Sequence, residues 1–221
     1  MSDQRRVVRA LVGAHGRTYA EEAGIRLKDT PQPLYRLLVL SLLLSARIRG
    51  SIAVGTAREL HRSGLRDPRR MADADRQERV DALGRGGYRR YDERTATQLG
   101  DGAKLLTERW GGDLRRLRAE ADGGIPELRR LLQEFPGIGP SGADIFLREV
   151  QSVWPEVAPY LDRRTLSGAE RLGLPKDPDR LLSLAGEAGD AEDVQPASLA
   201  AALVRAAIDE EVAEDSLRRA G

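Results

Sequence analysis

The stretch Leu132–Leu147, LQEFPGIGPSGADIFL, decides the fold of this chain. It predicts a helix, a short hairpin and a second helix. Pro136 ends the first helix, because a proline disfavours helical geometry in the residue before it. Gly137 and Gly139 permit a positive φ and let the backbone approach another molecule closely. The second helix is expected to begin near Pro140, whose fixed φ and missing N–H suit a first helical position.

The start of that second helix is a candidate anion site. The N–H groups of its first turn lack partners within the helix, and the positive end of the helix dipole lies there. A nucleic acid supplies phosphates that backbone amides bind without reading the base sequence. The residues expected to hold such a phosphate are Gly137, Ile138, Gly139, Ser141 and Gly142.

Two further stretches accompany the hairpin: Leu37–Ile48, LLVLSLLLSARI, and Tyr160–Leu166, YLDRRTL. With the hairpin they resemble the helix-hairpin-helix superfamily of DNA glycosylases, which includes endonuclease III. Leu37–Ile48 is similar to the family's early helix, which ends in a Leu-Leu-Ser-Ala-type turn facing DNA. Tyr160–Leu166 is similar to the segment in which a catalytic aspartate opens a helix. Three matches in the same order make the resemblance specific, which a lone Pro-Gly-Ile-Gly would not.

The resemblance implies an all-α fold of two helical lobes with a cleft between them. Residues 34–149 would form a helical barrel domain that contains the helix-hairpin-helix at about 128–150. Residues 1–33 and 150–221 would pair as a second, discontinuous helical domain. The cleft would hold Asp162 on one wall and the hairpin on the other.

The hydrophobic periodicity also predicts helices throughout and no alternating strand pattern. The expected helices span residues 4–14, 19–27, 34–46, 50–63, 75–83, 94–109, 125–135, 141–150, 161–172, 177–184 and 196–219. Asp67 is expected to cap a further turn, with Pro68 in its first position. Glycine and acidic residues at 186–193 predict a flexible loop.

The composition is that of an ordinary globular protein, with 40% hydrophobic and 32% charged residues in 221. No apolar run reaches the roughly 20 residues that a membrane-spanning helix needs, and no signal-peptide pattern occurs at the N-terminus. These features predict a cytoplasmic, nucleoid-associated protein of prokaryotic type, acting as a monomer. The net charge is only +1, but 33 of the 36 cationic residues are arginine, which suits phosphate recognition and is also typical of a GC-rich genome.

Cysteine is absent and histidine occurs only twice. The chain therefore cannot form a disulfide, a zinc–thiolate site or a cysteine-bound iron–sulfur cluster. It lacks the four-cysteine cluster loop that many relatives of endonuclease III carry. No cofactor and no resident metal are expected, apart from the monovalent cation that the resemblance implies on the hairpin carbonyls.

Asp162 is the expected catalytic residue. Release of a damaged base from DNA requires the nucleotide to flip out of the stack and leaves positive charge on the sugar. A carboxylate can stabilise that charge and orient or deprotonate a water. The alternative is that Asp162 only caps the helix that follows it, a position that aspartate favours. Both roles are compatible.

Ser141 occupies the position at which bifunctional relatives carry a lysine. That lysine attacks the sugar, forms a Schiff base and allows β-elimination. A serine cannot form an iminium, so the sequence predicts a glycosylase that uses water and does not cleave the strand. Ser141 would instead bond a phosphate or cap its helix. The rivals are a DNA-binding repair accessory protein without catalysis and a lyase that uses Lys104 or Lys28.

Arg47 occupies the position of a glutamine that enters the duplex in relatives, and could fill the space of the flipped nucleotide. The alternative is an exposed arginine at a helix end. The loop Gly84–Tyr91, GRGGYRRY, is a second candidate contact, with Tyr88 as an intercalating wedge and Arg89 on the backbone. Tyr88 could equally pack into the core against Trp110.

Trp154 and Tyr160 precede Asp162 and could line a pocket for the flipped base, although aromatic residues in a short loop more often serve packing. The expected partner is double-stranded DNA with a damaged or mispaired base. The sequence does not name the base: oxidised pyrimidine, uracil, alkylated purine and adenine opposite a lesion all remain open, because the shape of the pocket decides among them.

Overall fold

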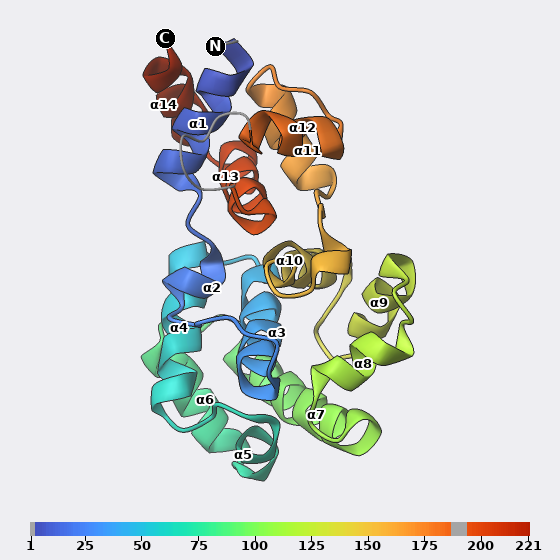
Figure 1. Cartoon of the computed structure of the whole chain (residues 1–221). Coiled ribbons are helices and arrows are strands. Elements are labelled where there is room, and N and C mark those ends of the chain that lie inside the picture. The colour runs from blue at the N-terminus through green and yellow to red at the C-terminus, as the bar shows by residue number, and fades with distance from the viewer. Residues whose placement is uncertain (1–2, 187–193) are drawn as a thin grey trace. The chain divides into compact units, whose positions relative to one another are not determined.

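The computed structural model of the chain describes residues 3–186 and 194–221, and all regular structure within them is helical (Figure 1). The described residues contain no β-strand. The all-α fold class predicted from the sequence is therefore confirmed. None of the described helices is both long and apolar enough to cross a membrane.

The chain divides into two compact units: unit 1 comprises Met1–Tyr19 and Arg148–Gly221, and unit 2 comprises Ala20–Leu147. The helices of the unit 1 segments are α1 (Asp3–His15), the 3₁₀ helix η1 (Pro155–Val157), α11 (Arg163–Arg171), α12 (Pro178–Gly186), α13 (Pro196–Ile208) and α14 (Glu210–Ala220). The remaining helices are α2 (Tyr19–Glu22), α3 (Pro31–Ser45), α4 (Gly50–Arg62), α5 (Pro68–Asp73), α6 (Arg76–Arg85), α7 (Asp92–Trp110), α8 (Leu114–Glu120), α9 (Ile125–Leu132) and α10 (Pro140–Val150).

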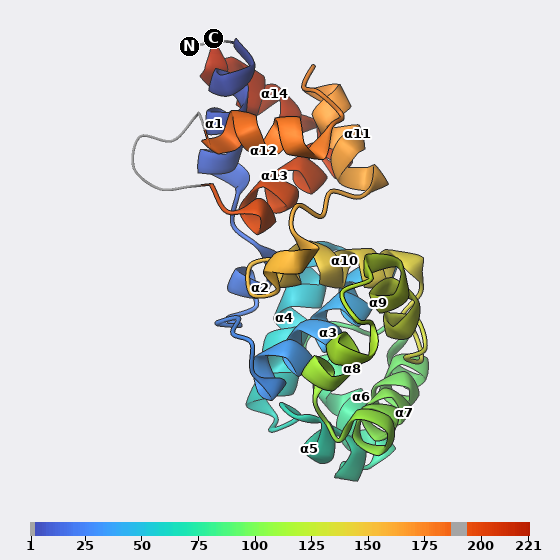
Figure 2. The same ribbon diagram turned by 45° about the vertical axis from the view of Figure 1, so that its right-hand side comes forward.

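Helix α3 is the central helix of unit 2. Its residues 34–35 and 37–43 are all buried, as expected for a helix that is apolar around its whole circumference. Helix α4 packs against it (Figures 1 and 2). The buried hydroxyl of Ser41 donates to the carbonyl of Leu37 at 2.8 Å, so this polar group is satisfied within the apolar core.

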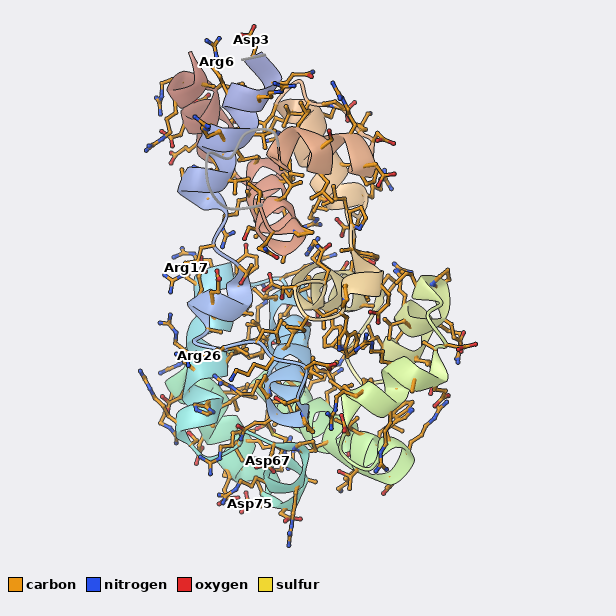
Figure 3. All side chains as sticks on the ribbon, viewed as in Figure 1. Asp3, Arg6, Arg17, Arg26, Asp67 and Asp75 are labelled. Carbon is orange, nitrogen blue, oxygen red and sulfur yellow. The ribbon has the colours of Figure 1, made fainter. Side chains whose placement is uncertain are left out.

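The ends of several unit 2 helices are fixed by local side chains. Asp67, which is labelled in Figure 3, accepts a hydrogen bond from the Arg70 backbone N–H at 2.9 Å, and the predicted cap of α5 is confirmed. Asp75 and Glu78 form a capping box at the start of α6. Helix α7 ends at Gly111, which has a φ of 62° and therefore favours glycine.

Unit 1 has its own hydrophobic core, formed by α1 and α11–α14. Its first and last helices, α1 and α14, lie side by side, so both chain ends lie in this unit (Figures 1 and 2). Helix α11 approaches α13 very closely at Gly168, where an added Cβ would lie 2.0 Å from the Leu203 carbonyl oxygen. Only glycine fits at this crossing.

Four details of the helix prediction were wrong. The expected helix 196–219 is two helices, because Asp209 is extended (φ −133°, ψ 117°) and its side chain accepts from the Glu211 N–H at 3.0 Å to start α14. Helix α8 was not predicted, although Asp113 caps it in the usual way. The first hairpin helix ends at Leu132, earlier than the expected residue 135, and the expected helix 19–27 is only α2.

The N-terminal boundary also differs from the predicted domains. Residues 20–33, assigned from the sequence to the discontinuous domain, belong to unit 2. Ala20, Ala23 and Ile25 are buried, which explains why this segment belongs to a packed unit. The expected flexible loop at 186–193 lies outside the described residues, apart from Gly186 at the end of α12.

Candidate functional site

The helix-hairpin-helix predicted from the sequence is present in unit 2. Helix α9 ends at Leu132, the chain turns through residues 133–139, and α10 begins at Pro140 as expected. Gly137 has a φ of 88°, in the left-handed region that favours glycine. Gly139 does not have a positive φ, so that part of the prediction was wrong for Gly139.

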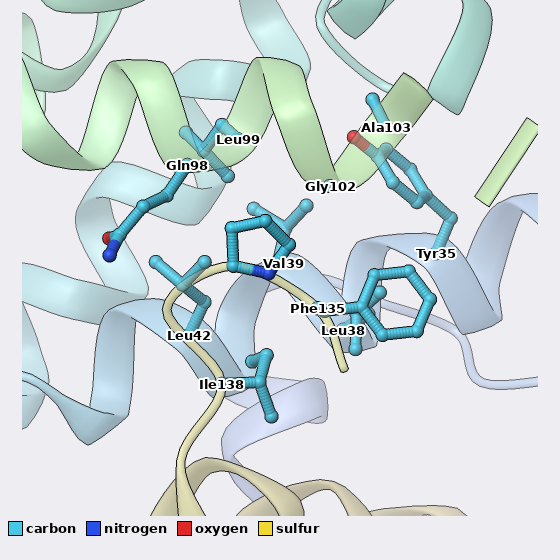
Figure 4. A pocket seen from close by; sticks show the side chains of 11 residues that line it. Tyr35, Leu38, Val39, Leu42, Gln98, Leu99, Gly102, Ala103, Phe135 and Ile138 are labelled. Carbon is cyan, nitrogen blue, oxygen red and sulfur yellow. The ribbon is translucent and has the colours of Figure 1, made fainter. Parts of the chain in front are cut away.

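The inner face of the hairpin is apolar. Phe135, Pro136 and Ile138 line a small pocket of about 20 Å³ against α3 and α7 (Figure 4). Phe135 and Ile138 are almost fully buried, at 2% and 4% exposure. The pocket is too small for a base, so this face of the hairpin serves packing and holds the loop on the two helices.

Polar contacts fix the hairpin further. Arg129 on α9 pairs with Asp144 on α10 at 2.7 Å and joins the two helices. Phe135 stacks on Trp110 at the end of α7, with ring centroids 5.5 Å apart. The indole N–H of Trp110 donates to Glu120 at 2.7 Å; this bond, together with nearby Arg109, lowers the pKa of the Glu120 carboxyl.

The start of α10 lies only partly at the surface, because Ser141 is exposed whereas Gly142 is buried. Among the described residues, the N–H groups of Ser141 and Gly142 have no acceptor, whereas that of Ala143 donates to Gly139 O at 3.0 Å. A Cβ added to Gly139 would meet no protein atom within 4 Å, so nothing inside the protein requires glycine there. The space beside Gly139 is open to an external molecule.

Two other helices of unit 2 lie close to this hairpin. A Cβ on Gly142 would lie 3.6 Å from Ser45, the last residue of α3, and Arg47 follows two residues later. A Cβ on Gly137 would lie 2.7 Å from the amide oxygen of Gln98 on α7. The structure therefore brings the end of α3 and the first half of α7 against the hairpin.

The loop of residues 86–91 joins the same region. The hydroxyl of Thr56 in α4 donates a hydrogen bond to the Gly86 carbonyl at 3.1 Å. A Cβ added to Gly87 would lie 3.8 Å from Ile52. This contact places the loop beside the first half of α4, the helix for which Arg49 is the N-cap residue. The hairpin therefore lies against the end of α3, and the loop lies against α4, the next helix in the chain.

Four arginines in this region have no carboxylate partner among the described residues. Arg47, Arg49, Arg89 and Arg94 are exposed, and none forms an ion pair with a described residue. Neighbouring Arg85, by contrast, pairs with Glu59 at 3.1 Å. Unpaired exposed guanidinium groups are available for phosphates. We call Arg47, Arg49, Arg89 and Arg94, together with residues 137–142, the hairpin surface.

Tyr88 lies in the core, and its predicted role as an intercalating wedge was wrong for this conformation. Its side chain is only 2% exposed, and its hydroxyl is 3.1 Å from the Thr95 hydroxyl, which donates to it. Burial raises the pKa of the phenol. The alternative interpretation of Tyr88 as a core residue is supported. The expected partner differs, because the ring that stacks on Trp110 is that of Phe135.

Asp162 lies in unit 1 as the N-cap of α11. Its Oδ1 accepts from the Thr165 backbone N–H at 2.9 Å, so the capping role is real. Its Oδ2 accepts from Arg148 Nη1 at 2.7 Å. The two side chains are only 11% and 9% exposed. Both carboxylate oxygens are bonded, yet each retains a lone pair that could accept from water.

The aromatic residues before Asp162 differ from each other. Trp154 is fully buried, so it cannot stack on a base in this conformation and its proposed place in a base pocket was wrong. Tyr160 is half-buried, and its backbone N–H donates to the buried side chain of Gln151 at 2.8 Å. Tyr160 therefore remains a candidate for contact with a base.

The sequence did not single out Arg148, Gln151 or Gln98. Arg148 lies in the last turn of α10 and Gln151 directly follows the helix, three residues later, a spacing that places both on one side next to the segment before Asp162. That spacing was the available signal. Among the described residues, no group of three or more His, Asp or Glu side chains could hold a metal ion.

Three comparisons with known proteins complete this description. No family model matches the sequence, and no curated protein matches it. Among solved structures, the chain is similar to endonuclease III in a trapped covalent intermediate with DNA, an estranged-adenine complex. The TM-score is 0.49 at 14% identity, over 93% of this chain and 85% of that one.

Proposed function

We propose that the protein is a DNA glycosylase that hydrolyses the bond between a damaged or mispaired base and its sugar. The observation that carries this proposal is the hairpin surface, where unpaired arginines and free backbone amides meet on unit 2. Such a surface suits the phosphates of double-stranded DNA. The three sequence motifs that resemble those of DNA glycosylases support base excision as the reaction.

Asp162 is the proposed catalytic residue. A buried carboxylate held in one orientation by Arg148 can stabilise positive charge that develops on the sugar. Its free lone pairs can orient a water for attack on the sugar carbon. Tyr160, the neighbouring half-buried aromatic residue, is the proposed contact for the flipped base.

Strand cleavage through a Schiff base is not part of the proposal. The side chain of Ser141 has no amine that could form a Schiff base. Because Ser141 is exposed, its hydroxyl can donate a hydrogen bond to a phosphate oxygen. Lys104 follows Gly102, which faces Phe135 and Pro136 of the hairpin. Two residues further along a helix correspond to about 200° of rotation, so Lys104 projects from the face of α7 opposite the hairpin.

We further propose that the enzyme works as a cytoplasmic monomer without an iron–sulfur cluster, for which the chain has no cysteine. The carbonyl oxygens of Gly137 and Ile138 accept no hydrogen bond from a described residue. They are suited to a monovalent cation that would bridge the hairpin and a phosphate.

A DNA-binding protein without catalysis is the second candidate. The observation in its favour is that both oxygens of Asp162 are already bonded within the protein, as in a purely structural cap. On this view the hairpin surface would bind DNA, and Asp162 and Arg148 would only stabilise unit 1.

A panel of duplexes tests the proposal. Each duplex carries one uracil, thymine glycol, ethenoadenine, or adenine opposite 8-oxoguanine. After incubation, each sample is divided between alkaline heating and neutral quenching. Strand breaks only after alkali are expected, for at least one duplex. Breaks without alkali would reveal a lyase amine. No breaks in either arm, despite measurable binding, would favour the protein without catalysis.

A further inference from the structure

Two buried polar side chains, one in the last turn of α10 and one directly after it, face the segment leading to Asp162. Both residues, Arg148 and Gln151, are buried. A buried arginine is rare unless it is paired, because the desolvation of its charge is costly. The partner of Arg148 is Asp162, at 2.7 Å between Nη1 and Oδ2.

Gln151 holds the backbone on the other side of this pair. Its side-chain oxygen accepts from the Tyr160 N–H at 2.8 Å, and its side-chain nitrogen donates to the Tyr160 carbonyl at 3.3 Å. The same nitrogen donates to the Arg148 carbonyl at 2.9 Å. The residue two positions before Asp162 is therefore bonded at both its N–H and its carbonyl.

We propose that Arg148 and Gln151 are positioning residues for Asp162, an inference that rests on the proposed glycosylase function. Gln151 fixes the backbone at Tyr160. Arg148 fixes the rotamer of the carboxylate through a charge-assisted hydrogen bond. With Thr165 on Oδ1, these contacts leave the carboxylate a single orientation.

The burial of Arg148 separates it from the arginines that would bind DNA. Arg163 and Arg164 follow Asp162 directly and are exposed, so they can reach a phosphate. Arg148 cannot reach one without leaving its carboxylate. Its effect on the reaction must therefore pass through Asp162, and its loss should change the rate of base release and leave the affinity for DNA unchanged.

Arg79 provides a matched control. It is also a buried arginine, at 9% exposure, but its guanidinium donates to the backbone carbonyls of Met71, Ala74 and Ala96. No described carboxylate pairs with it. Arg79→Met should lower the melting temperature and leave the rate of base release unchanged at temperatures well below melting.

The test measures single-turnover base release and the dissociation constant for the best duplex of the lesion panel. Arg148→Met is expected to slow base release by about 100-fold, the effect of a misplaced catalytic group, with an unchanged dissociation constant. Arg148→Lys should restore part of the rate. Gln151→Leu should slow base release by a smaller factor in the same way.

Stability is controlled by the double variant Arg148→Met with Asp162→Asn, which leaves no buried charge unpaired. Its melting temperature should exceed that of Arg148→Met alone. Equal rates in Arg148→Met and wild type, or a parallel loss of DNA affinity, would overturn the inference and leave the glycosylase proposal standing. A wild-type protein that releases no base from any duplex would overturn the glycosylase proposal and this inference together.

Discussion

The hairpin surface and the surroundings of Asp162 differ in whether their polar groups have hydrogen-bond partners within the protein. On the hairpin surface, the N–H groups of Ser141 and Gly142 and the guanidinium of Arg47 have no partner among the described residues. Around Asp162, both carboxylate oxygens and the Arg148 guanidinium are bonded within the protein. The first region is prepared for an external anion, and the second is organised before any ligand arrives.

This difference indicates a division of roles. Unpaired groups at a surface cost little, because water solvates them until a phosphate replaces the water. A buried charge without a partner would destabilise the folded protein by roughly several kcal/mol, so the carboxylate must be paired before DNA binds. Binding and catalysis are therefore expected to respond to different substitutions.

The largest expected effect concerns the helix that begins at Asp162. Gly168→Ala would place a methyl group 2.0 Å from the Leu203 carbonyl, and a backbone atom cannot move aside as a flexible side chain can. We expect a loss of about 3 kcal/mol in the free energy of unfolding, measured by chemical denaturation. Gly13→Ala in α1, where an added methyl meets nothing within 4 Å, should not destabilise. Equal stabilities of the two variants would refute the close approach of α11 and α13.

The next effect concerns DNA binding by the hairpin surface. Replacement of Arg47, Arg49 and Arg89 by glutamine should weaken binding about 100-fold at low salt and reduce the salt slope by about one per arginine. The control replaces three exposed arginines of unit 2 that pair with carboxylates, Arg62, Arg69 and Arg76. Both variants change the net charge equally. If the control weakens binding as much, only the overall charge matters and the hairpin surface is not a site.

A smaller effect tests whether the inner face of the hairpin serves packing. Gly102→Ala adds a methyl group 3.8 Å from Phe135 and 3.9 Å from Pro136, at ordinary contact distance. Because alanine also favours a helix, we expect the free energy of unfolding to rise by about 1 kcal/mol. Thermal or chemical denaturation measures this change.

Gly100 in the same helix is the control. Its added methyl group would lie 2.7 Å from the guanidinium carbon of Arg79, so Gly100→Ala should destabilise. A destabilising Gly102→Ala would show that the pocket behind the hairpin does not have the described shape.

The smallest effect concerns Asp215, a half-buried carboxylate on α14 that is remote in sequence from both regions. Its hydrogen bond from Arg219, with smaller contributions from His15 and Arg218, lowers its pKa below the ordinary value of 3.8. A lowered pKa stabilises the folded state at pH values above 3.8, and this stabilisation disappears as the pH falls through the lowered pKa. The melting temperature of Asp215→Asn should therefore lie below that of wild type near neutral pH and converge with it in acid. A constant difference down to about pH 2 would contradict the assigned ion pair.

The sequence was sufficient to predict the hairpin, because proline and glycine act locally. Pro136 and Gly137 exclude a continuous helix and Pro140 begins α10, whereas the end of α9 at Leu132 does not depend on them. The helix break at Asp209 was missed for the opposite reason. Pro196–Ala220 has a helical pattern throughout, and only the extended backbone at Asp209 separates α13 from α14.

The candidate site could be predicted only in part. Asp162 was found by its position in a motif and as a local cap, whereas its partner Arg148 depends on which face of α10 is buried. Tyr88 and Trp154 were assigned to DNA and base contacts by residue type, but their burial depends on tertiary packing that no local pattern encodes. Gly139 differs from these two residues, because no protein atom lies within 4 Å of a Cβ added to it.

The most direct measurement of the central claim compares Asp162→Asn with Gly139→Ala on one lesion duplex. We expect Asp162→Asn to bind as tightly as wild type and to release base at least about 100-fold more slowly. Gly139→Ala should melt at the wild-type temperature, bind about tenfold more weakly and release base normally once DNA saturates it. If both variants lost binding and base release together, or if Asp162→Asn remained fully active, the division of roles would be contradicted.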